Sequence, residues 1–294
     1  MSISGTTSTS QHVQGLTDYL SHNQGVVIGE VHNDRASSQY LMENLETARK
    51  CGVKYLFLES LESDIYQEHI DTYQAAPDKP MPPKLANALY FQDIILAGKE
   101  KAGLDPSQLK QLQRDMSSSN QSTREAACQA MERLQKYSST QVHTRTSVVE
   151  KASELGIKII LVDSSQLKNL GGAQRLKALN EVGCKIIKQT TINSSDKYIS
   201  VAGQHHTVEQ LGVSGLRSRL RVPLIQVDTN THNNQRLAAN NITSGSGENR
   251  YQVDLQVLLP KATDYTAAIE AAPAPSPSPH TDIVVPQENI DFFG

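Results

Sequence analysis

The sequence of 294 residues contains no tryptophan, only three cysteines and only four phenylalanines. With aromatic residues at 5%, Ile, Leu, Val and Ala have to supply most of the hydrophobic core. The cysteines are too few and too far apart for a disulfide framework or a structural zinc site, which favours a reducing compartment. No stretch approaches the roughly 20 apolar residues that a membrane helix needs, so we expect no transmembrane segment.

The sequence also lacks a large excess of charge of either sign. The net charge is −3, and the lysines and arginines are scattered along the chain rather than clustered. Proteins that bind nucleic acid present a basic face, so no nucleic-acid partner is expected. Hydrophobic residues at 37% and charged residues at 20% are typical of a globular protein.

The first residues lack both the basic start and the apolar run of a secretory signal peptide. Residues 1–14 are instead rich in Ser, Thr and Gln, and we expect residues 1–20 to form a disordered polar leader. The protein would be cytoplasmic as made. Leaders of this composition also occur on bacterial effectors, so export or injection into a host cell stays open.

Five short apolar runs predict an α/β fold with a mainly parallel central sheet flanked by helices. Continuous aliphatic runs, in place of alternating ones, indicate strands that are buried on both faces. Helical patterns lie between them, as at Leu41, Leu45 and Ala48, where Gly52 marks the stop. The five predicted strands are residues 25–28, 54–58, 157–162, 198–202 and 223–227.

The segment between the second and third predicted strands is helical throughout, which predicts a helical insertion over about residues 61–150. We expect one domain over residues 21–262. Residues 230–249 should form a long loop, and the alternating run from Tyr251 to Val257 should be an edge strand. The Pro-rich composition after Ala271 predicts a disordered tail over residues 263–294. Cys128 and Cys184 fall in helical patterns and are expected in the core.

Polar side chains follow each predicted strand, at the edge of a parallel sheet where ligands bind. Glu30 and His32 follow the first strand, Glu59 the second, Asp163 the third and His206 the fourth. If the chain stays extended after the first strand, Glu30 and His32 point the same way. A single histidine at a strand end is more often a hydrogen-bonded structural residue. The combination of acids and histidines predicts a functional site.

These motifs resemble a known superfamily. The runs Val27–His32 and Tyr55–Glu59 are similar to the opening of the group that contains erythromycin esterases, ChaN-like haem-uptake proteins and Tiki/TraB proteins. The stretch "ASELGIKIILVD" resembles its third strand with the preceding helix, and "GQHHT" resembles its second Gly-x-x-His element. Arg175 and Asn180 resemble a recurrent pair. The resemblance is closest to the Tiki-like domains of bacterial toxins and effectors.

The resemblance implies a hydrolase of the protease or esterase class. His32 and His206 match the two motif histidines, and Glu30 and Glu59 match the acidic pair. Either glutamate would be the general base, while the histidines would bind a divalent metal (Mn, Co, Zn or Fe) or stabilise an oxyanion. A metal could take Glu30 and Glu59 as further ligands. Arg175, Asp163 and Asn180 would lie at the substrate.

A second interpretation stays open. ChaN-like members bind haem, so the chain could be a non-catalytic module that binds haem or another ligand, or that docks on a host protein. In the catalytic interpretation the substrate would be a small molecule, a lipid or a peptide.

Overall fold

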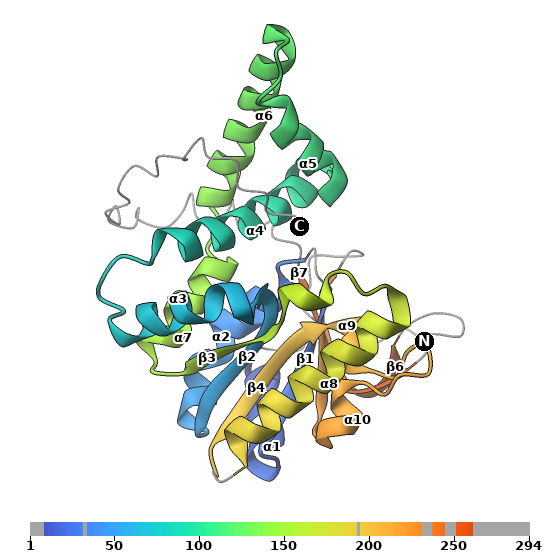
Figure 1. The fold of residues 1–294 in the computed structure, drawn as a ribbon. Coiled ribbons are helices and arrows are strands. Elements are labelled where there is room, and N and C mark those ends of the chain that lie inside the picture. Colours follow the sequence, from blue (N-terminus) through green and yellow to red (C-terminus); the bar gives the residue numbers. More distant parts are fainter. Residues whose placement is uncertain (1–8, 32–33, 193–194, 231–236, 245–250, 261–294) are drawn as a thin grey trace.

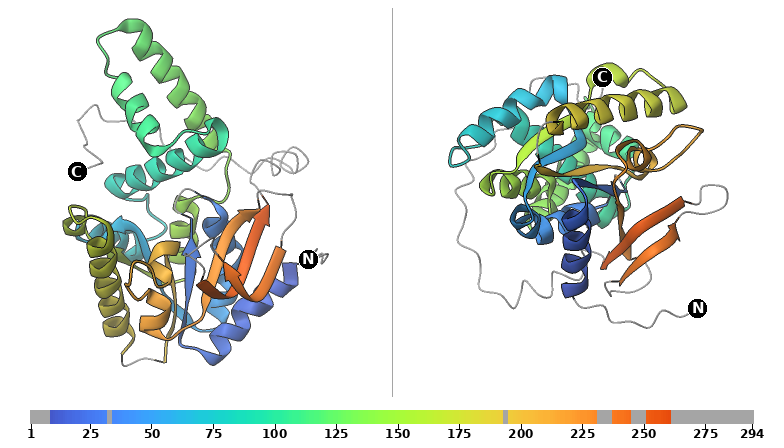
Figure 2. Two further views of the ribbon diagram at one scale, coloured as in Figure 1. Left: turned by 90° about the vertical axis from the view of Figure 1, so that its right-hand side faces the viewer. Right: turned by 90° about the horizontal axis from the view of Figure 1, so that it is seen from below.

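The computed structural model describes residues 9–31, 34–192, 195–230, 237–244 and 251–260, and these residues form an α/β fold with helices on both faces of a sheet (Figures 1 and 2). The sheet has seven strands in the order β3-β2-β4-β1-β5-β7-β6. Six strands are parallel, and β6 is antiparallel to β7. The strands are β1 (Gly25–Glu30), β2 (Val53–Glu62), β3 (Lys158–Asp163), β4 (Lys197–Gly203), β5 (Leu224–Asn230), β6 (Leu237–Ser244) and β7 (Tyr251–Pro260).

The helices alternate with the strands, as expected for parallel pairing, which needs a crossover between neighbours. They are α1 (Thr9–His22), α2 (Ala36–Lys50), α3 (Ser63–Ala75), α4 (Pro83–Ala102), α5 (Pro106–Asp115), α6 (Gln121–Ser139), α7 (Arg145–Glu154), the 3-10 turn η1 (Ser165–Leu167), α8 (Gly172–Thr191), α9 (Gln204–Thr207) and α10 (Leu216–Leu220).

The mainly parallel sheet predicted from the apolar runs is confirmed, and each run coincides with a strand to within one residue at its start. All six residues of β1 are buried, because helices cover both faces of the sheet. On one face Val26 and Ile28 pack with apolar residues of α1, α2, α3 and α7. On the other face Val27 packs with residues of α8 and α10. Successive side chains of a strand therefore belong to two separate cores.

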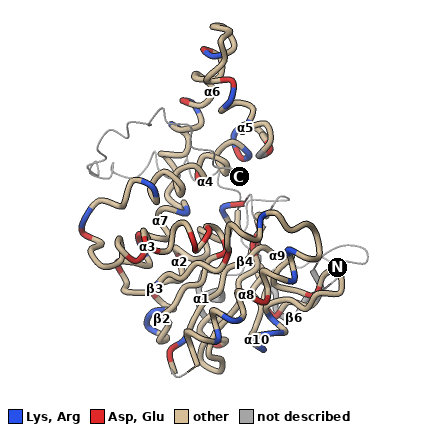
Figure 3. Tube along the Cα trace, in the orientation of Figure 1, with Lys and Arg blue, Asp and Glu red and all other residues tan. Residues whose placement is uncertain are grey.

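The helical insertion between β2 and β3 is also confirmed, and it consists of α3 to α7. Helices α5 and α6 project away from the sheet (Figure 1) and pack with the second half of α4. This projection has a small apolar core of its own, formed by Ile94, Leu109, Met131 and Leu134. In Figure 3 acidic and basic positions are interspersed along the trace of the described residues.

The expected disordered leader is wrong for its second part, because residues 9–22 form helix α1. Leu16 and Leu20 are spaced one helical turn apart, and both are fully buried against the first core. The hydroxyl of Tyr19 also donates to the backbone oxygen of Asp254. Because the rest of the segment is polar, these two leucines were too weak a pattern to predict a helix. Residues 1–8 and the predicted tail lie outside the described residues.

The predicted loop at residues 230–249 and the predicted edge position of β7 are corrected. Strand β6 lies within that segment and pairs with one side of β7, while β5 pairs with the other. The alternating burial of β7 is as expected, but it reflects a half-covered face and not a free edge. Cys184 is buried as predicted, whereas Cys128 is exposed on α6. Within the described residues no helix is long and apolar enough to cross a membrane.

Candidate functional site

The predicted acidic residues lie at or near the carboxyl ends of β1, β2 and β3, His206 lies in α9 directly after β4, and Arg175 and Asn180 lie in α8. Glu30 is the last residue of β1, and its Cα is paired with that of Gly203, the last residue of β4. The backbone N–H of Gly203 donates to Oε2 of Glu59 on β2 at 2.9 Å. Because neighbouring strands lie about 4.8 Å apart, Glu30 and Glu59 are separated by roughly 10 Å of backbone, with β4 between them.

His206 lies between Glu59 and Asn180. Its Nε2 is 3.3 Å from Oε1 of Glu59, and its Nδ1 is 2.9 Å from Oδ1 of Asn180. The imidazole is 12% exposed and the glutamate side chain 7%, so both side chains are largely buried but retain some contact with solvent. The sequence motif predicts His206 at the site and His205 away from it, and His205 is indeed exposed. Both histidines lie in the short helix α9, which turns His206 toward α8.

The hydrogen bonds of Asn180 determine which ring nitrogen of His206 carries the proton. The side-chain amide of Asn180 donates to the backbone oxygen of Ser214, so its carbonyl oxygen is the atom that faces His206. A carbonyl oxygen only accepts, and Nδ1 must therefore be the donor. In the neutral ring Nε2 is then unprotonated and faces the carboxyl group of Glu59. The Glu59–His206 pair can take up one proton at this position.

Glu30 has a different set of partners. Both of its carboxylate oxygens lie within 2.8 Å of the guanidinium of Arg145, and Ser37 donates to Oε2 at 2.6 Å. The ion pair is buried, with side-chain exposures of 4% for Glu30 and 8% for Arg145. Arg145 was not predicted from the sequence; it is the first residue of α7 and lies 115 positions from Glu30. No local pattern could have indicated a partner at that distance.

The two glutamates point to opposite faces of the sheet. Glu30 has the same orientation along its strand as Val26 and Ile28, which face α2 and α7. Glu59 follows Leu58 of that same core and turns to the other face, where it contacts His206 and lies near Asn180 of α8. The structure therefore brings Glu59, His206 and Asn180 together and places Glu30 in a separate cluster. His32 lies outside the described residues.

The helical insertion holds the Glu30 cluster in position. The carboxylate of Asp93 on α4 accepts hydrogen bonds from the backbone N–H groups of Arg145 and Thr146 at the start of α7. Arg35 donates to Glu100 and to the backbone oxygen of Asp93. Burial raises the pKa of Asp93, and the hydrogen bonds from α7 act against that rise. Contacts from α4 therefore hold the start of α7 in place, and with it the position of Arg145 beside Glu30.

Asp163 and Arg175 form a third group at the end of β3. Their closest atoms are 3.2 Å apart, and the arginine side chain is 32% exposed. Burial raises the pKa of Asp163, while the charge of Arg175 lowers it. Arg175 is therefore partly open to solvent at the carboxyl edge, and its contact with a substrate stays a prediction.

Two further carboxyl groups lie at this edge: Asp228, which follows the fifth predicted strand, and Asp34, which was not predicted there. The pKa of Asp228 is raised by burial and then by the charge of Asp34. Asp34 also accepts from the backbone N–H of Thr229 at 3.0 Å, which ties the chain after β1 to the end of β5. The signal was present in the sequence, because Asp228 directly follows the fifth apolar run.

Gly29 is needed for packing. A side chain at this position would overlap the amide of Gln226, which is buried on the neighbouring strand β5. The amide nitrogen of Gln226 in turn lies 3.5 Å from Oε1 of Gln204, next to His206. The space beside Gly29 is therefore filled by a protein side chain.

The described residues do not form a metal cage. Among them no group of three or more His, Cys, Asp and Glu side chains lies close enough to hold an ion. His206 has both ring nitrogens engaged, and Arg145 occupies both oxygens of Glu30. The same engagement makes His206 a poor ligand for haem iron. The predicted metal ligand His32 lies outside the described part of the chain, so the metal site stays a prediction.

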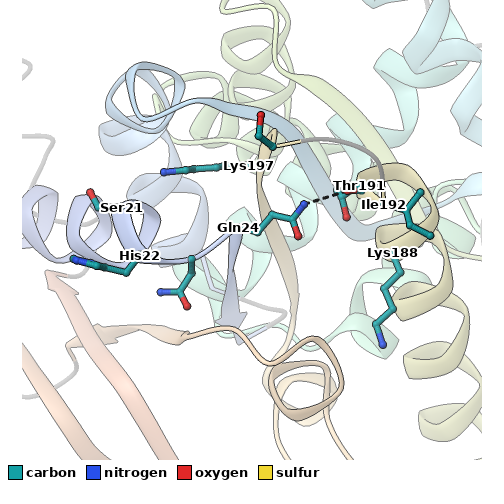
Figure 4. Close-up of a pocket in the computed structure, with 9 residues that line it drawn as sticks. Ser21, His22, Gln24, Lys188, Thr191, Ile192 and Lys197 are labelled. Atoms are coloured by element: carbon teal, nitrogen blue, oxygen red, sulfur yellow. Dashed lines mark hydrogen bonds between the residues drawn. The ribbon is translucent and has the colours of Figure 1, made fainter.

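A hollow at the opposite edge of the sheet has none of the predicted residues in its lining (Figure 4). Its volume is about 690 Å³, and it lies between the end of α1 and the end of α8. Lys197 donates to the backbone oxygen of Leu20, and the ring of His22 is hydrogen-bonded to the backbone oxygen of Asp18. These side chains stabilise the end of α1 and do not converge on the hollow.

Comparisons with known proteins give similar folds but no similar sequence. No protein-family model and no curated protein matches the chain. The chain is similar to the structure of RRSP, a MARTX toxin effector domain from Vibrio vulnificus CMCP6, with 20% identity over 73% of this chain and 35% of that one and a TM-score of 0.47. It is similar to the type III effector HopBA1, with 13% identity over 85% and 94% of the two chains and a TM-score of 0.44.

A haem-binding protein is among the similar structures as well. ChaN of Campylobacter jejuni matches with 13% identity over 86% of this chain and 92% of that one, at a TM-score of 0.36. The chain spans 35 to 38% of the length of the first three toxin structures. The TM-scores to RRSP, HopBA1 and ChaN all lie below one half. What this chain does therefore has to be argued from its own side chains.

Proposed function

We propose that the chain is a hydrolase of the bacterial effector type in which Glu59 and His206 activate water. The observation that carries the proposal is the chain of contacts from Glu59 through His206 to Asn180, whose donors and acceptors are set by Ser214. Such an arrangement, in which one group orients an imidazole beside a carboxylate, is typical of general acid–base sites. The effector assignment rests on the sequence resemblance to toxin-borne domains.

The proposed reaction transfers one proton from water to the Glu59–His206 pair and then to the leaving group. A water molecule at the carboxyl edge attacks the carbonyl carbon of an ester or amide, and its proton passes to the Glu59–His206 pair. The resulting imidazolium lies between a carboxylate and an amide oxygen, both of which stabilise its charge. The same proton then passes to the leaving oxygen or nitrogen as the carbon–heteroatom bond breaks, which restores the pair.

Glu59 is a better candidate for the base than Glu30. A carboxylate whose oxygens are engaged by a guanidinium and a hydroxyl is poorly suited to accept a further proton, and Glu30 is held in this way by Arg145 and Ser37. In Glu59, by contrast, Oε2 accepts from the neutral backbone N–H of Gly203, and Oε1 faces the imidazole of His206 at 3.3 Å. Arg175, partly exposed on the same edge, would orient a carbonyl or carboxylate of the substrate.

The test is incorporation of heavy oxygen. A lysate of host cells is incubated with the protein in ¹⁸O-labelled water, and carboxyl groups that gain the label are identified by mass spectrometry. Wild type and His205→Ala should give labelled products, and Glu59→Gln should give none while keeping its melting temperature. Labelling that persists in Glu59→Gln, or its absence from wild type, would contradict the proposal. A chelator should leave the labelling unchanged, because the proposed reaction uses no metal.

A further inference from the structure

The projecting helices of the insertion enclose a hollow far from the Glu59–His206 pair. Its volume is about 520 Å³, and it lies between the end of α4 and the second half of α6. On α6 the lining positions 130, 133, 134 and 137 recur at helical spacing and form one face of the helix. Figure 1 shows α5 and α6 extending away from the sheet.

The lining combines an apolar floor with a cationic rim. Leu104, Leu134 and the ring of Tyr137 supply the floor, and Leu134 is continuous with the small core of the projection. The rim consists of Lys101, Arg133 and Lys136, all exposed, and the lining contains no acidic side chain.

These three cations have no carboxylate partner among the described residues. Lys101 lies over the ring of Tyr137, with Nζ 5.6 Å from its centroid. Arg133 donates to the backbone oxygen of Gln129. The ion pairs of α4 and α6 involve other side chains, such as that of Arg35 with Glu100. The rim therefore has positive charge available for a partner, on a protein whose net charge is −3.

We propose that this hollow binds an acidic peptide segment of a partner protein, through a bulky apolar side chain inserted over Leu134 and Tyr137. Carboxylates beside that anchor would pair with Lys101, Arg133 and Lys136. A volume of about 520 Å³ suits one or two aromatic side chains. Buried apolar anchors surrounded by complementary charge are the usual source of affinity and specificity in peptide recognition. This docking site is independent of the proposed hydrolytic site.

The experiment measures binding of a labelled peptide to the full chain by fluorescence anisotropy. The probe has two phenylalanines flanked by glutamates, and its controls carry alanine for phenylalanine or lysine for glutamate. We expect saturable binding of the probe alone. Lys101→Glu/Lys136→Glu should weaken it by at least about tenfold, since two attractive charges become repulsive. Ala130→Phe, which fills the hollow without changing charge, should weaken it similarly.

The matched control is Arg114→Glu/Lys188→Glu, which makes the same change in charge at exposed cations outside the hollow. It should bind as wild type does, and the melting temperatures of all variants should agree. Equal weakening by this control, equal binding of the alanine peptide, or no binding would overturn the proposal. Binding that appears only after deletion of residues 285–294 would identify the acidic, Phe-containing end of this sequence as the occupant in place of a partner.

Discussion

Nε2 of His206 lies 3.3 Å from Oε1 of Glu59, while Nδ1 of the same ring is fixed by Asn180 at 2.9 Å. The neutral ring should therefore carry its proton on Nδ1. Two-dimensional NMR of histidine ring nitrogens measures this directly. We expect the Nδ1–H form in wild type and a shift toward the Nε2–H form in Asn180→Ala, because the acceptor at Nδ1 is lost. An Nε2–H form in wild type would show that the orientation of Asn180 is reversed.

The buried ion pair of Glu30 and Arg145 should make a large difference to the free energy of unfolding when one partner is removed. Arg145→Met leaves the carboxylate buried without its cation, which typically costs about 3–5 kcal/mol. The double variant Glu30→Gln/Arg145→Met removes both charges and should recover much of that loss. Urea unfolding of the two single variants and the double variant measures the coupling. Additive losses would mean that the two side chains do not interact as the distances indicate.

Gly29→Ala should destabilise the sheet although alanine is a small residue. The added methyl group would overlap the buried amide of Gln226, and overpacking of this kind costs about 1–3 kcal/mol. Shortening the neighbour in Gly29→Ala/Gln226→Ser makes room and should restore part of the melting temperature. Gly171→Ala is the comparison, because nothing lies within 4 Å of its added Cβ and its φ is −100°, so it should change the melting temperature little.

The contribution of Asp228 to the free energy of unfolding should decrease as the pH rises. Its pKa is raised above the ordinary value by burial and by Asp34, so the folded state holds a proton that the unfolded state has released. That contribution is fully present below the unfolded pKa and is lost as the pH rises through the folded pKa.

The variant Asp228→Asn isolates this effect, since its amide can donate to Asp34 at every pH. The difference in free energy of unfolding, Asp228→Asn minus wild type, should increase from about pH 4 to about pH 8. Denaturant titrations at several pH values measure it. A difference that is flat over this range would show that Asp228 ionises as in the unfolded chain.

The central sheet could be predicted because its strands are continuous apolar runs, and such runs are buried on both faces wherever helices flank them. Helix α1 was missed because only Leu16 and Leu20 mark its buried side within a polar segment. The separate starts of α5 and α7 within the insertion were missed as well, although α5 had a local signal. Asp105 and Gln108 form a capping box at the start of α5, and Pro106 occupies its first turn.

The candidate site could be predicted only in part, because strand-end position gives the edge of the sheet but not the face. Glu30 and Glu59 both follow apolar runs, and the alternation of each strand sends them to opposite sides. The pairing of Glu30 with Arg145 depends on how the insertion returns to the sheet, and sequence spacing contains no information about that return.

The position of β1 in the sheet has a consequence for synthesis on the ribosome. Gly25 pairs with Tyr198, which is 173 positions later (198 − 25), and the other neighbour of β1 is β5, which comes later still. At 5–20 residues per second, β1 waits roughly 10 to 35 seconds for either partner. During that interval both edges of an apolar strand are unpaired, and such a strand is prone to aggregation. The nascent chain should therefore depend on a chaperone until β4 and β5 have emerged.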